Sequence, residues 1–215
     1  MERVICIVIG HVFGLFQTAF IYGKLHGIDI REHGSGNAGT TNTLRVLGTK
    51  AGLIVLAGDI IKCILAIVLC GIIFGGSHPE EIYLLKLYAA AGAILGHNFP
   101  FYLNFKGGKG IAATAGLILA FHPYFIVMGV VLFFGTFFTT HYVSLGSLLV
   151  YAGLMIQMAV CGQMGLFGTS QQVLNEMYII TALLTILAYY KHRENIKRLL
   201  KGEERKTYLT KKNKA

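Results

Sequence analysis

The chain has 215 residues, of which 54% are hydrophobic and only 13% are charged, and its formal net charge is +9 at pH 7. Charged residues approach a quarter of an ordinary soluble domain, so this composition excludes a soluble globular fold. Ten of the nineteen Lys and Arg residues follow Tyr190, which leaves the preceding body more apolar still. We therefore expect an all-α, polytopic membrane protein with a single domain at residues 1–204 and a basic tail at residues 205–215.

Three apolar segments in the first half of the chain are candidates for membrane-spanning helices. A helix needs about 20 residues to cross a hydrocarbon core of about 30 Å. Val4–Tyr22 and Ala51–Phe74 meet this length, whereas Ile82–Leu95 is shorter. Lys86 lies near one end of that shorter segment, where its side chain can reach the interface. The first segment lacks the basic region and cleavage site of a signal peptide, so we interpret it as a retained span.

The longest apolar segment, Ile111–Thr140, has thirty residues, which is too long for one span and short for two. His122-Pro123 lies inside it, and proline breaks a helix because it lacks a backbone donor and clashes with the preceding turn. We therefore expect two helices, the first short or strongly tilted because about eleven residues cover only about 16 Å. Val143–Val160 and Val173–Tyr190 complete a predicted set of seven transmembrane helices.

The positions of the cations predict which side each loop faces. With seven helices, the loops at 24–50, 97–110 and 140–144 share one side with the tail. That side holds all ten cations of the tail and Lys24, Arg31, Arg45, Lys50, Lys106 and Lys109. The opposite loops hold none, and Arg3 at the N-terminus is the exception. Because cytoplasmic loops are rich in Lys and Arg, we expect the N-terminus outside and the C-terminus in the cytoplasm.

The first polar loop, GSGNAGTTNTLR at residues 34–45, has the composition of a phosphate-binding loop. Its glycines Gly34, Gly36 and Gly39 allow close approach to a ligand, and successive N–H groups of such a turn bind anions. Hydroxyl and amide donors come from Ser35, Asn37, Thr40, Thr41 and Asn42. Arg45 adds a planar guanidinium suited to phosphate. A polar turn between two helices would explain the glycines but not the density of donors.

The second polar loop, GHNFPFYLNFKGGKG at residues 96–110, carries two lysines on a glycine turn. Lys106 and Lys109 flank Gly107-Gly108 directly before the next predicted helix. Helix N-termini favour anions, so this turn is a second candidate for phosphate binding. His97 precedes it, and a structural role for this histidine competes with a catalytic or substrate-binding one.

Two further loops on the same side carry candidate residues. Ser144 and Ser147 share a face at a helix start, where they either cap the helix or face a ligand. In KHRENIKRLLKGEE, His192 and Asn195 also share a face. The rest of this segment is typical of an amphipathic helix on an anionic membrane surface, and that attraction also accounts for Lys197, Arg198 and the residues after Gly202. We expect KTYLTKKNKA to be disordered.

Other charged residues give no assignable catalytic pair. Asp59 and Lys62 lie at i and i+3 within the second span, either as a mutual ion pair or as part of a functional cavity. No His, Cys, Asp or Glu residues have metal-ligand spacing, so we expect neither a metal nor another cofactor. A site rich in cations and poor in bases suits anionic substrates, with catalysis by positioning and electrostatics.

These motifs resemble those of the bacterial acyl-phosphate:glycerol-3-phosphate acyltransferase (PlsY) family. The matching segments are DIREHGSGNAGTTNTLR, GHNFPFYLNFKGGKG, YVSLGS and HRENIKRLLKGEE, in the family's order up to about Glu204. The resemblance implies seven transmembrane helices in the bacterial plasma membrane and an active site facing the cytoplasm. It also implies acyl transfer from acyl phosphate to the 1-hydroxyl of sn-glycerol 3-phosphate, which gives lysophosphatidic acid and inorganic phosphate at the first step of phospholipid synthesis.

The resemblance also implies roles for individual residues. A substrate phosphate oxygen, rather than a protein base, would help to deprotonate the attacking hydroxyl. The group proposed to hold glycerol 3-phosphate is Ser35, Arg45, Lys106, His192 and Asn195. The glycine-rich backbone at Gly34, Gly36, Gly39, Gly107 and Gly108 would take the acyl-phosphate head together with Asn37, Thr41 and Ser144. Plausible members of the same shell are Lys109, Asn42, His97 and Ser147. The chain departs from the family pattern at Phe16-Gln17, Thr40, Cys63 and His141.

Two other functions compete with acyl transfer. A transporter for a phosphorylated metabolite would explain the helices and the cations, but its site would lie near the membrane midplane between internal repeats, and no repeat is visible. A lipid-binding subunit would explain the hydrophobicity but not the two glycine loops. We expect acyl phosphate, glycerol 3-phosphate and membrane lipid as partners and no nucleic acid; the sequence does not indicate a protein partner or the acyl chain length.

Overall fold

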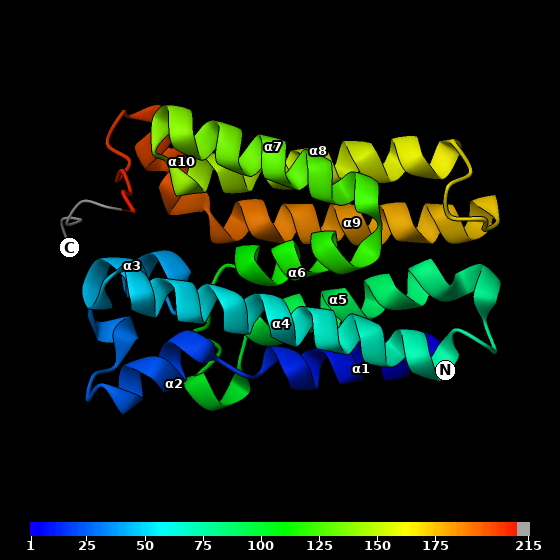
Figure 1. Ribbon diagram of the computed structural model, residues 1–215, viewed down its shortest axis with the longest axis horizontal. Coiled ribbons are helices and arrows are strands. Elements are labelled where there is room, and N and C mark those ends of the chain that lie inside the picture. Colours follow the sequence, from blue (N-terminus) through cyan, green and yellow to red (C-terminus); the bar gives the residue numbers. More distant parts are fainter. Residues whose placement is uncertain (210–215) are drawn as a thin grey trace.

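The computed structural model describes residues 1–209, and all of its regular structure in this range is helical (Figure 1). The α-helices are α1 (Glu2–Gly14), α2 (Thr18–Leu25), α3 (Thr40–Leu47), α4 (Thr49–Phe74), α5 (Ile82–Asn98), α6 (Ile111–Phe121), α7 (Pro123–Thr140), α8 (Val143–Gln163), α9 (Gln171–Lys191) and α10 (Arg193–Leu200). Short 3-10 turns form at Ile30–Glu32, Pro79–Glu81 and Phe101–Leu103. The long helices lie side by side, and the short helices α2, α3 and α10 gather at one end, at the left of Figure 1. The all-α prediction is confirmed.

Within the described residues, five helical segments are long and apolar enough to cross a membrane. They are Glu2–Leu25, which combines α1 and α2, together with α4, α7, α8 and α9. At 17 residues, α5 is shorter than these, and α6 has only 11. The number of seven spans and the orientation of the termini therefore stay predictions.

The first predicted span, Val4–Tyr22, is not one continuous helix. The helix is interrupted between Gly14 and Thr18. At this break the buried side chain of Gln17 donates hydrogen bonds to backbone carbonyl groups at the end of α1 and at the end of α5. The Gln17 amide lies within 3.2 Å of the Gly14 oxygen, 3.3 Å of the Gly96 oxygen and 3.1 Å of the His97 oxygen. These contacts fix the break against the end of α5.

The predicted break at His122-Pro123 is confirmed. His122 is extended, with φ −158° and ψ 142°, and Pro123 is the first residue of α7. The Nδ1 atom of His122 accepts a hydrogen bond from the backbone N–H of Tyr124 at 3.4 Å. The eleven-residue α6 is therefore a short helix that turns back into α7.

Helices α1 and α5 pack closely through two GxxxG patterns that face each other. A Cβ atom on Gly10 would lie 1.9 Å from the Ala89 oxygen, and one on Gly14 would lie 2.3 Å from the Ala93 oxygen. The reciprocal glycines of α5, Gly92 and Gly96, would meet α1 backbone oxygens at 2.1 and 2.4 Å. Small residues let backbones approach in this way where lipid removes the hydrophobic drive for helix association.

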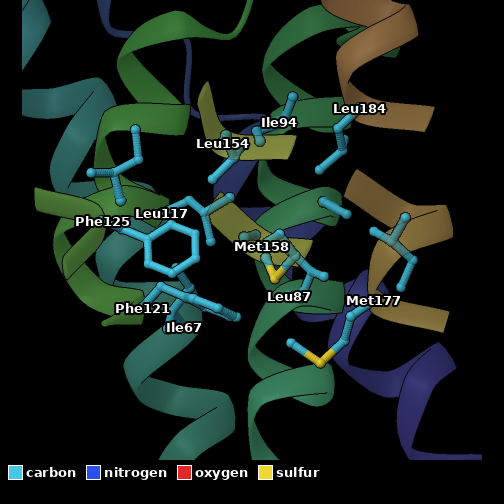
Figure 2. Close-up of a cluster of buried hydrophobic side chains, with 14 of the residues drawn as sticks. Ile67, Leu87, Ile94, Leu117, Phe121, Phe125, Leu154, Met158, Met177 and Leu184 are labelled. Carbon is cyan, nitrogen blue, oxygen red and sulfur yellow. The ribbon is translucent and has the colours of Figure 1, made fainter. Parts of the chain in front are cut away.

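The core joins helices from both halves of the chain (Figure 2). Buried side chains from six helices, α4 to α9, meet there, and those labelled in the figure are Ile67, Leu87, Ile94, Leu117, Phe121, Phe125, Leu154, Met158, Met177 and Leu184. Many large apolar side chains instead face outward, among them Ile72, Val131, Ile156 and Ile186. An apolar exterior of this extent suits lipid contact.

Arg3, the cation that departs from the charge pattern, is paired with carboxylates at the end of the bundle away from α3 and α10. Its Nε donates to Glu176 at 2.8 Å and its Nη1 donates to Glu81 at 3.3 Å. The Tyr88 hydroxyl donates to the same Glu176 carboxylate at 2.6 Å. This network joins α1, α5 and α9 and pairs Arg3 with two carboxylates.

Candidate active site

The two glycine loops, the start of α8 and the α9–α10 junction surround one cavity of about 510 Å³. All of the predicted site residues except Gly108 line it. They are Ser35, Arg45, Lys106, His192, Asn195, Gly34, Gly36, Asn37, Gly39, Thr41, Asn42, His97, Gly107, Lys109, Ser144 and Ser147. Four segments that are far apart in the sequence thus contribute to a single polar cavity.

Asn42 organises the first loop. Its Oδ1 accepts from the Ser35 backbone N–H at 2.8 Å, and its Nδ2 donates to the carbonyls of Ile30 and His33 at 3.0 and 2.9 Å. The side chain is 1% exposed, and both amide atoms are used within the loop. The Asn42 side chain therefore holds the loop in its conformation. The Ser35 side chain, in contrast, is exposed at the rim of the cavity.

The DIRE segment before this loop connects it to the second loop. Arg31 donates to both carboxylate oxygens of Asp29, at 3.0 and 2.7 Å, and its Nη1 donates to the Leu103 carbonyl at 3.2 Å. The hydrogen bond from Arg31 lowers the pKa of Asp29 to about 2. Asp29 is therefore ionised at neutral pH and belongs to the scaffold of the site.

The second half of the predicted loop is helical, because α3 begins at Thr40. The Gly39 carbonyl accepts both the Thr43 N–H and the Thr43 hydroxyl, at 3.0 and 3.1 Å. Thr40 and Thr41 therefore stand in the first turn, where backbone N–H groups are available to an anion. One turn further on, burial and then the proximity of Arg205 lower the pKa of Arg45, which stays cationic.

The second loop needs glycine for close packing against His97. A Cβ atom on Gly108 would lie 2.1 Å from His97 Nε2 and 2.9 Å from the Ala38 oxygen. One on Gly107 would lie 2.1 Å from the His97 oxygen. Gly108 thus joins the two loops from behind the cavity and does not line it, while Lys106 is exposed beside Gly107.

Beneath the loops, His97 belongs to a buried polar network that includes the Asp59–Lys62 pair. Lys62 Nζ lies 2.7 Å from Asp59 Oδ1, 2.6 Å from the Phe16 oxygen and 2.9 Å from His97 Nδ1. All three titratable side chains are at most 5% exposed, and Asp59 and His97 line the cavity. The ion pair and the cavity role, which the sequence leaves as alternatives, therefore occur together.

The other wall of the cavity is a chain of polar contacts that ends on Glu204. Lys109 Nζ donates to Asn195 Oδ1, and Asn195 Nδ2 donates to Glu204 Oε1 at 2.7 Å. Ser144 Oγ donates to the same oxygen at 3.0 Å, and Arg198 Nε donates to Glu204 Oε2 at 2.8 Å. Burial lowers the pKa of Lys109 to about 8. The nearby Glu204 carboxylate raises this pKa, whereas the cations Arg198 and Lys191 lower it.

His192 presents a neutral imidazole to this cavity. Its Nδ1 lies 2.8 Å from the Ala188 carbonyl, a contact that places the proton on Nδ1 and leaves Nε2 as an acceptor. Burial lowers the pKa of His192 to about 4, with a further contribution from the Lys109 cation. At neutral pH this imidazole carries no charge and can accept a hydrogen bond at Nε2.

An apolar groove of about 450 Å³ adjoins the polar cavity. Both are lined by Thr40, Thr41, Ile111, Ala112 and Val143, so they meet at the first turns of α3 and α6. The groove continues between α4, α6 and α7 past residues such as Ala115, Ile118 and Phe133. The Thr40 hydroxyl at this junction is buried and has no hydrogen-bond partner among residues 1–209.

Several cavity residues lie outside the predicted set. Arg198, which the sequence assigns to the membrane surface, instead pairs with Glu204, and both line the cavity. The disorder predicted from Lys206 onward is wrong for Lys206–Leu209, since Thr207 is 2% exposed and bonded to Arg45. Residues 210–215 of the predicted tail lie outside the described residues. In the sequence, Glu204 is indicated only by its place at the end of HRENIKRLLKGEE, one of the segments that resemble the family.

Within residues 1–209 no three His, Cys, Asp or Glu side chains are grouped so that they could hold a metal ion. The cavity presents lysine and arginine cations, hydroxyls and backbone N–H groups. This donor set suits a phosphate-bearing ligand.

Comparisons with known proteins agree on one family. A sequence profile described as "Glycerol-3-phosphate acyltransferase" matches residues 4–202. Glycerol-3-phosphate acyltransferase 2 of Bacillus cereus is 39% identical over 209 residues, which is 96% of each chain. Glycerol-3-phosphate acyltransferase of Bacillus subtilis (strain 168) is 40% identical over 201 residues, covering 93% of this chain and 95% of the relative.

Two solved structures have the same fold. Both are crystal structures of PlsY (YgiH), an integral membrane glycerol 3-phosphate acyltransferase. The glycerol 3-phosphate form has a TM-score of 0.81 and 28% identity, covering 97% of this chain and 96% of that one. The lysophosphatidic acid form has a TM-score of 0.79 and 27% identity, covering 97% of each chain.

Proposed function

Because the chain belongs to the glycerol-3-phosphate acyltransferase family, we propose that it transfers a fatty acyl group from acyl phosphate to the 1-hydroxyl of glycerol 3-phosphate. The products are lysophosphatidic acid and inorganic phosphate. The observation that carries this proposal is the junction of a cationic cavity with an apolar groove at the first turns of α3 and α6. A substrate with a phosphate head and a long hydrocarbon chain needs both environments side by side.

The polar cavity is the proposed binding site for the two phosphate groups. Arg45, Lys106 and Lys109 supply positive charge, and Ser35 and Asn195 supply neutral donors around it. The backbone N–H groups of the glycine loop and of the first turn of α3 add uncharged hydrogen-bond donors. Electrostatic stabilisation by fixed donors of this kind acts where charge develops during acyl transfer.

His192 is the proposed acceptor for the non-reacting 2-hydroxyl of glycerol 3-phosphate, so the hydrogen of the attacking 1-hydroxyl is left for a substrate phosphate oxygen. Its neutral imidazole with a proton on Nδ1 cannot donate through Nε2 to a phosphate, so Nε2 suits a hydroxyl hydrogen instead. The oxygen of the 1-hydroxyl forms the new ester bond to the acyl carbon, the bond between the acyl carbon and the phosphate oxygen breaks, and the 1-hydroxyl proton is the one that moves. The hydroxyl proton ends on the departing phosphate, which conserves charge without a protein base.

The apolar groove is the proposed path for the acyl chain. It begins at Thr40 and Thr41, where the carbonyl carbon would lie, and continues along α6 toward Ile118. The groove would confine the acyl chain beside the polar cavity, and this confinement would orient the head toward its phosphate ligands. The buried Thr40 hydroxyl at the entrance, which has no hydrogen-bond partner among residues 1–209, is the proposed donor to the acyl-phosphate oxygens.

We further propose seven membrane-spanning helices with the cavity facing the cytoplasm. The cations of the cavity and those of α10 lie at one end of the bundle, and Arg3 at the other end is paired with Glu81 and Glu176. This arrangement follows the excess of Lys and Arg in cytoplasmic loops. Reporter fusions at the C-terminus and in the 75–81 loop test it, since the first must report the cytoplasm and the second the outside.

The experiment that tests the reaction supplies labelled glycerol 3-phosphate to the purified chain with palmitoyl phosphate, palmitoyl-coenzyme A or palmitoyl-acyl carrier protein. We expect labelled lysophosphatidic acid from palmitoyl phosphate alone, and its loss in the Ser35→Ala and Lys106→Ala variants. Product formation from coenzyme A or carrier-protein donors would contradict the choice of donor. Uptake of unchanged glycerol 3-phosphate into vesicles without a product would support the transporter alternative.

A further inference from the structure

Residues 203–209, here called the C-terminal strap, cross the opening of the candidate active site after α10 ends. Gly202 turns the chain with φ +71°, and the Glu203 N–H donates to the Arg198 carbonyl at 2.8 Å. Farther along, the Thr207 N–H donates to the His141 carbonyl at 2.9 Å. The strap thus connects α10 with the α7–α8 junction.

The far end of the strap lies against the start of α4. The Thr49 hydroxyl donates to the Leu209 carbonyl at 3.0 Å. The rings of Tyr208 and His141 lie 4.7 Å apart, and the Lys206 ammonium lies 5.9 Å from the Tyr142 ring. The strap is therefore attached at both of its ends and along its length.

Thr207 is the strap residue whose side chain binds Arg45, a predicted substrate-binding residue, just as Glu204 binds Asn195 and Ser144. Arg45 Nη2 donates to Thr207 Oγ1 at 2.8 Å and to the Arg205 carbonyl at 3.3 Å. Within residues 1–209, the Arg45 side chain makes these two hydrogen bonds through Nη2, and its buried Nε has no partner. The strap therefore holds one edge of the guanidinium and leaves its other N–H groups for a ligand.

The strap also borders both parts of the site. Glu204 and Arg205 line the polar cavity, whereas Thr207 and Leu209 line the apolar groove. Thr207 is only 2% exposed, so its contact with Arg45 is made away from solvent. These residues lie beyond position 202, where the match to the family profile ends.

We propose that Thr207 is a positioning residue for glycerol 3-phosphate, which orients the Arg45 guanidinium toward the substrate phosphate from the C-terminal strap. The inference rests on the proposed function, because it assigns Arg45 to that phosphate. A hydroxyl that accepts one Nη2 hydrogen fixes the plane of the guanidinium and lowers the entropy lost when phosphate binds. Losing this contact weakens substrate binding more than it slows the chemical step.

Steady-state kinetics of the purified full chain with palmitoyl phosphate and glycerol 3-phosphate test this proposal. In Thr207→Val, which keeps the shape and removes the acceptor, we expect the KM for glycerol 3-phosphate to rise about tenfold, the scale of a hydrogen bond to a charged group. We expect kcat and the KM for palmitoyl phosphate to change less than threefold. Thr207→Ser, which keeps the hydroxyl and removes the methyl group, should have the wild-type KM. If the methyl group mattered only through packing, this variant would instead have an altered KM.

Thr49→Val is the matched control. It removes another hydroxyl contact of the strap, the one to Leu209, and leaves Arg45 and Thr207 in place. Its KM for glycerol 3-phosphate should stay within twofold of wild type. In an Arg45→Ala background, Thr207→Val should have no further effect, because the partner of the hydroxyl is already gone.

The outcomes separate this inference from the proposed function. If the wild-type chain forms no lysophosphatidic acid, the function is wrong; if it does and Thr207→Val keeps the wild-type KM, the inference is wrong. Equal effects of Thr207→Val with and without Arg45 would also overturn it. Thr207→Ala, compared in the same way, supplies the measurement if the valine variant is not recovered as folded protein.

Discussion

The Lys62 ammonium donates to Nδ1 of His97 at 2.9 Å in the buried layer beneath the two glycine loops. An ammonium has no acceptor, so this contact leaves the imidazole proton on Nε2, the atom that faces the backbone of Gly108. The charge of Lys62 is balanced by Asp59 at 2.7 Å. The ion pair within α4 thus supports the loop that carries Lys106 and Lys109.

We expect Lys62→Met to destabilise the fold by about 3–5 kcal/mol, because it leaves the Asp59 carboxylate buried without its counter-ion. The double variant Asp59→Asn/Lys62→Met should recover much of that loss, since no net charge then remains buried. Unfolding midpoints in detergent measure both effects. A double variant that is less stable than Lys62→Met would contradict this explanation.

The pKa of Lys109, which burial lowers to about 8, predicts the alkaline limit of activity. Below pH 8 the ammonium is charged and attracts phosphate; above pH 8 the charge is lost, so kcat/KM for glycerol 3-phosphate should fall. In Lys109→Arg the cation persists, and the fall should move to higher pH. Lys197→Arg, at an exposed position of α10, is the control and should leave the profile unchanged. An identical alkaline limb in all three proteins would exclude Lys109 as its origin.

The facing glycines of α1 and α5 predict that a single methyl group at this interface is costly. In Gly92→Ala the new Cβ would lie 2.1 Å from the Ile7 oxygen, so the helices must separate. We expect a loss of stability of about 1–3 kcal/mol, as for overpacked cores. Gly135→Ala in α7, where the Cβ meets no atom of residues 1–209 within 4 Å, should be neutral or slightly stabilising. Thermal unfolding of both variants checks this, and equal midpoints would show that the close approach is dispensable.

The apolar groove predicts a change in acyl chain preference when it is narrowed. Ala115 lies along the groove, so Ala115→Phe should reduce kcat/KM for palmitoyl phosphate by about tenfold or more, because the ring fills space that the acyl chain would occupy. Octanoyl phosphate, whose chain is shorter, should be affected less. Val127→Phe, on the outward face of α7, is the control. If Ala115→Phe lowers kcat/KM equally for palmitoyl phosphate and octanoyl phosphate, the groove does not hold the far end of the acyl chain.

Much of this architecture can be predicted from local sequence features. Apolar length predicts the long helices, and the steric effect of Pro123 predicts where α6 ends. The density of glycine, hydroxyl and cationic residues in the loops is equally local. The predicted common side of the loops at 24–50 and 97–110 agrees with the finding that their candidate residues, except Gly108, line one cavity.

Features that depend on contacts between distant segments are not visible in the sequence in the same way. The break at Gln17 exists because its amide binds carbonyls of α5, and the order of the strap exists because Thr207 meets Arg45 and His141. Arg198 has the composition of a membrane-facing cation and is instead fixed by Glu204, six residues later. The partners of these side chains become apparent only when the helices are assembled.

The central claim is that acyl phosphate is consumed only when glycerol 3-phosphate accepts its acyl group. The most direct measurement is inorganic phosphate release by the purified chain in lipid, with palmitoyl phosphate alone and with glycerol 3-phosphate added. We predict release that requires both substrates, matches lysophosphatidic acid one to one, and is lost in Lys106→Ala. Release that is independent of glycerol 3-phosphate, or product formed without phosphate, would contradict the claim.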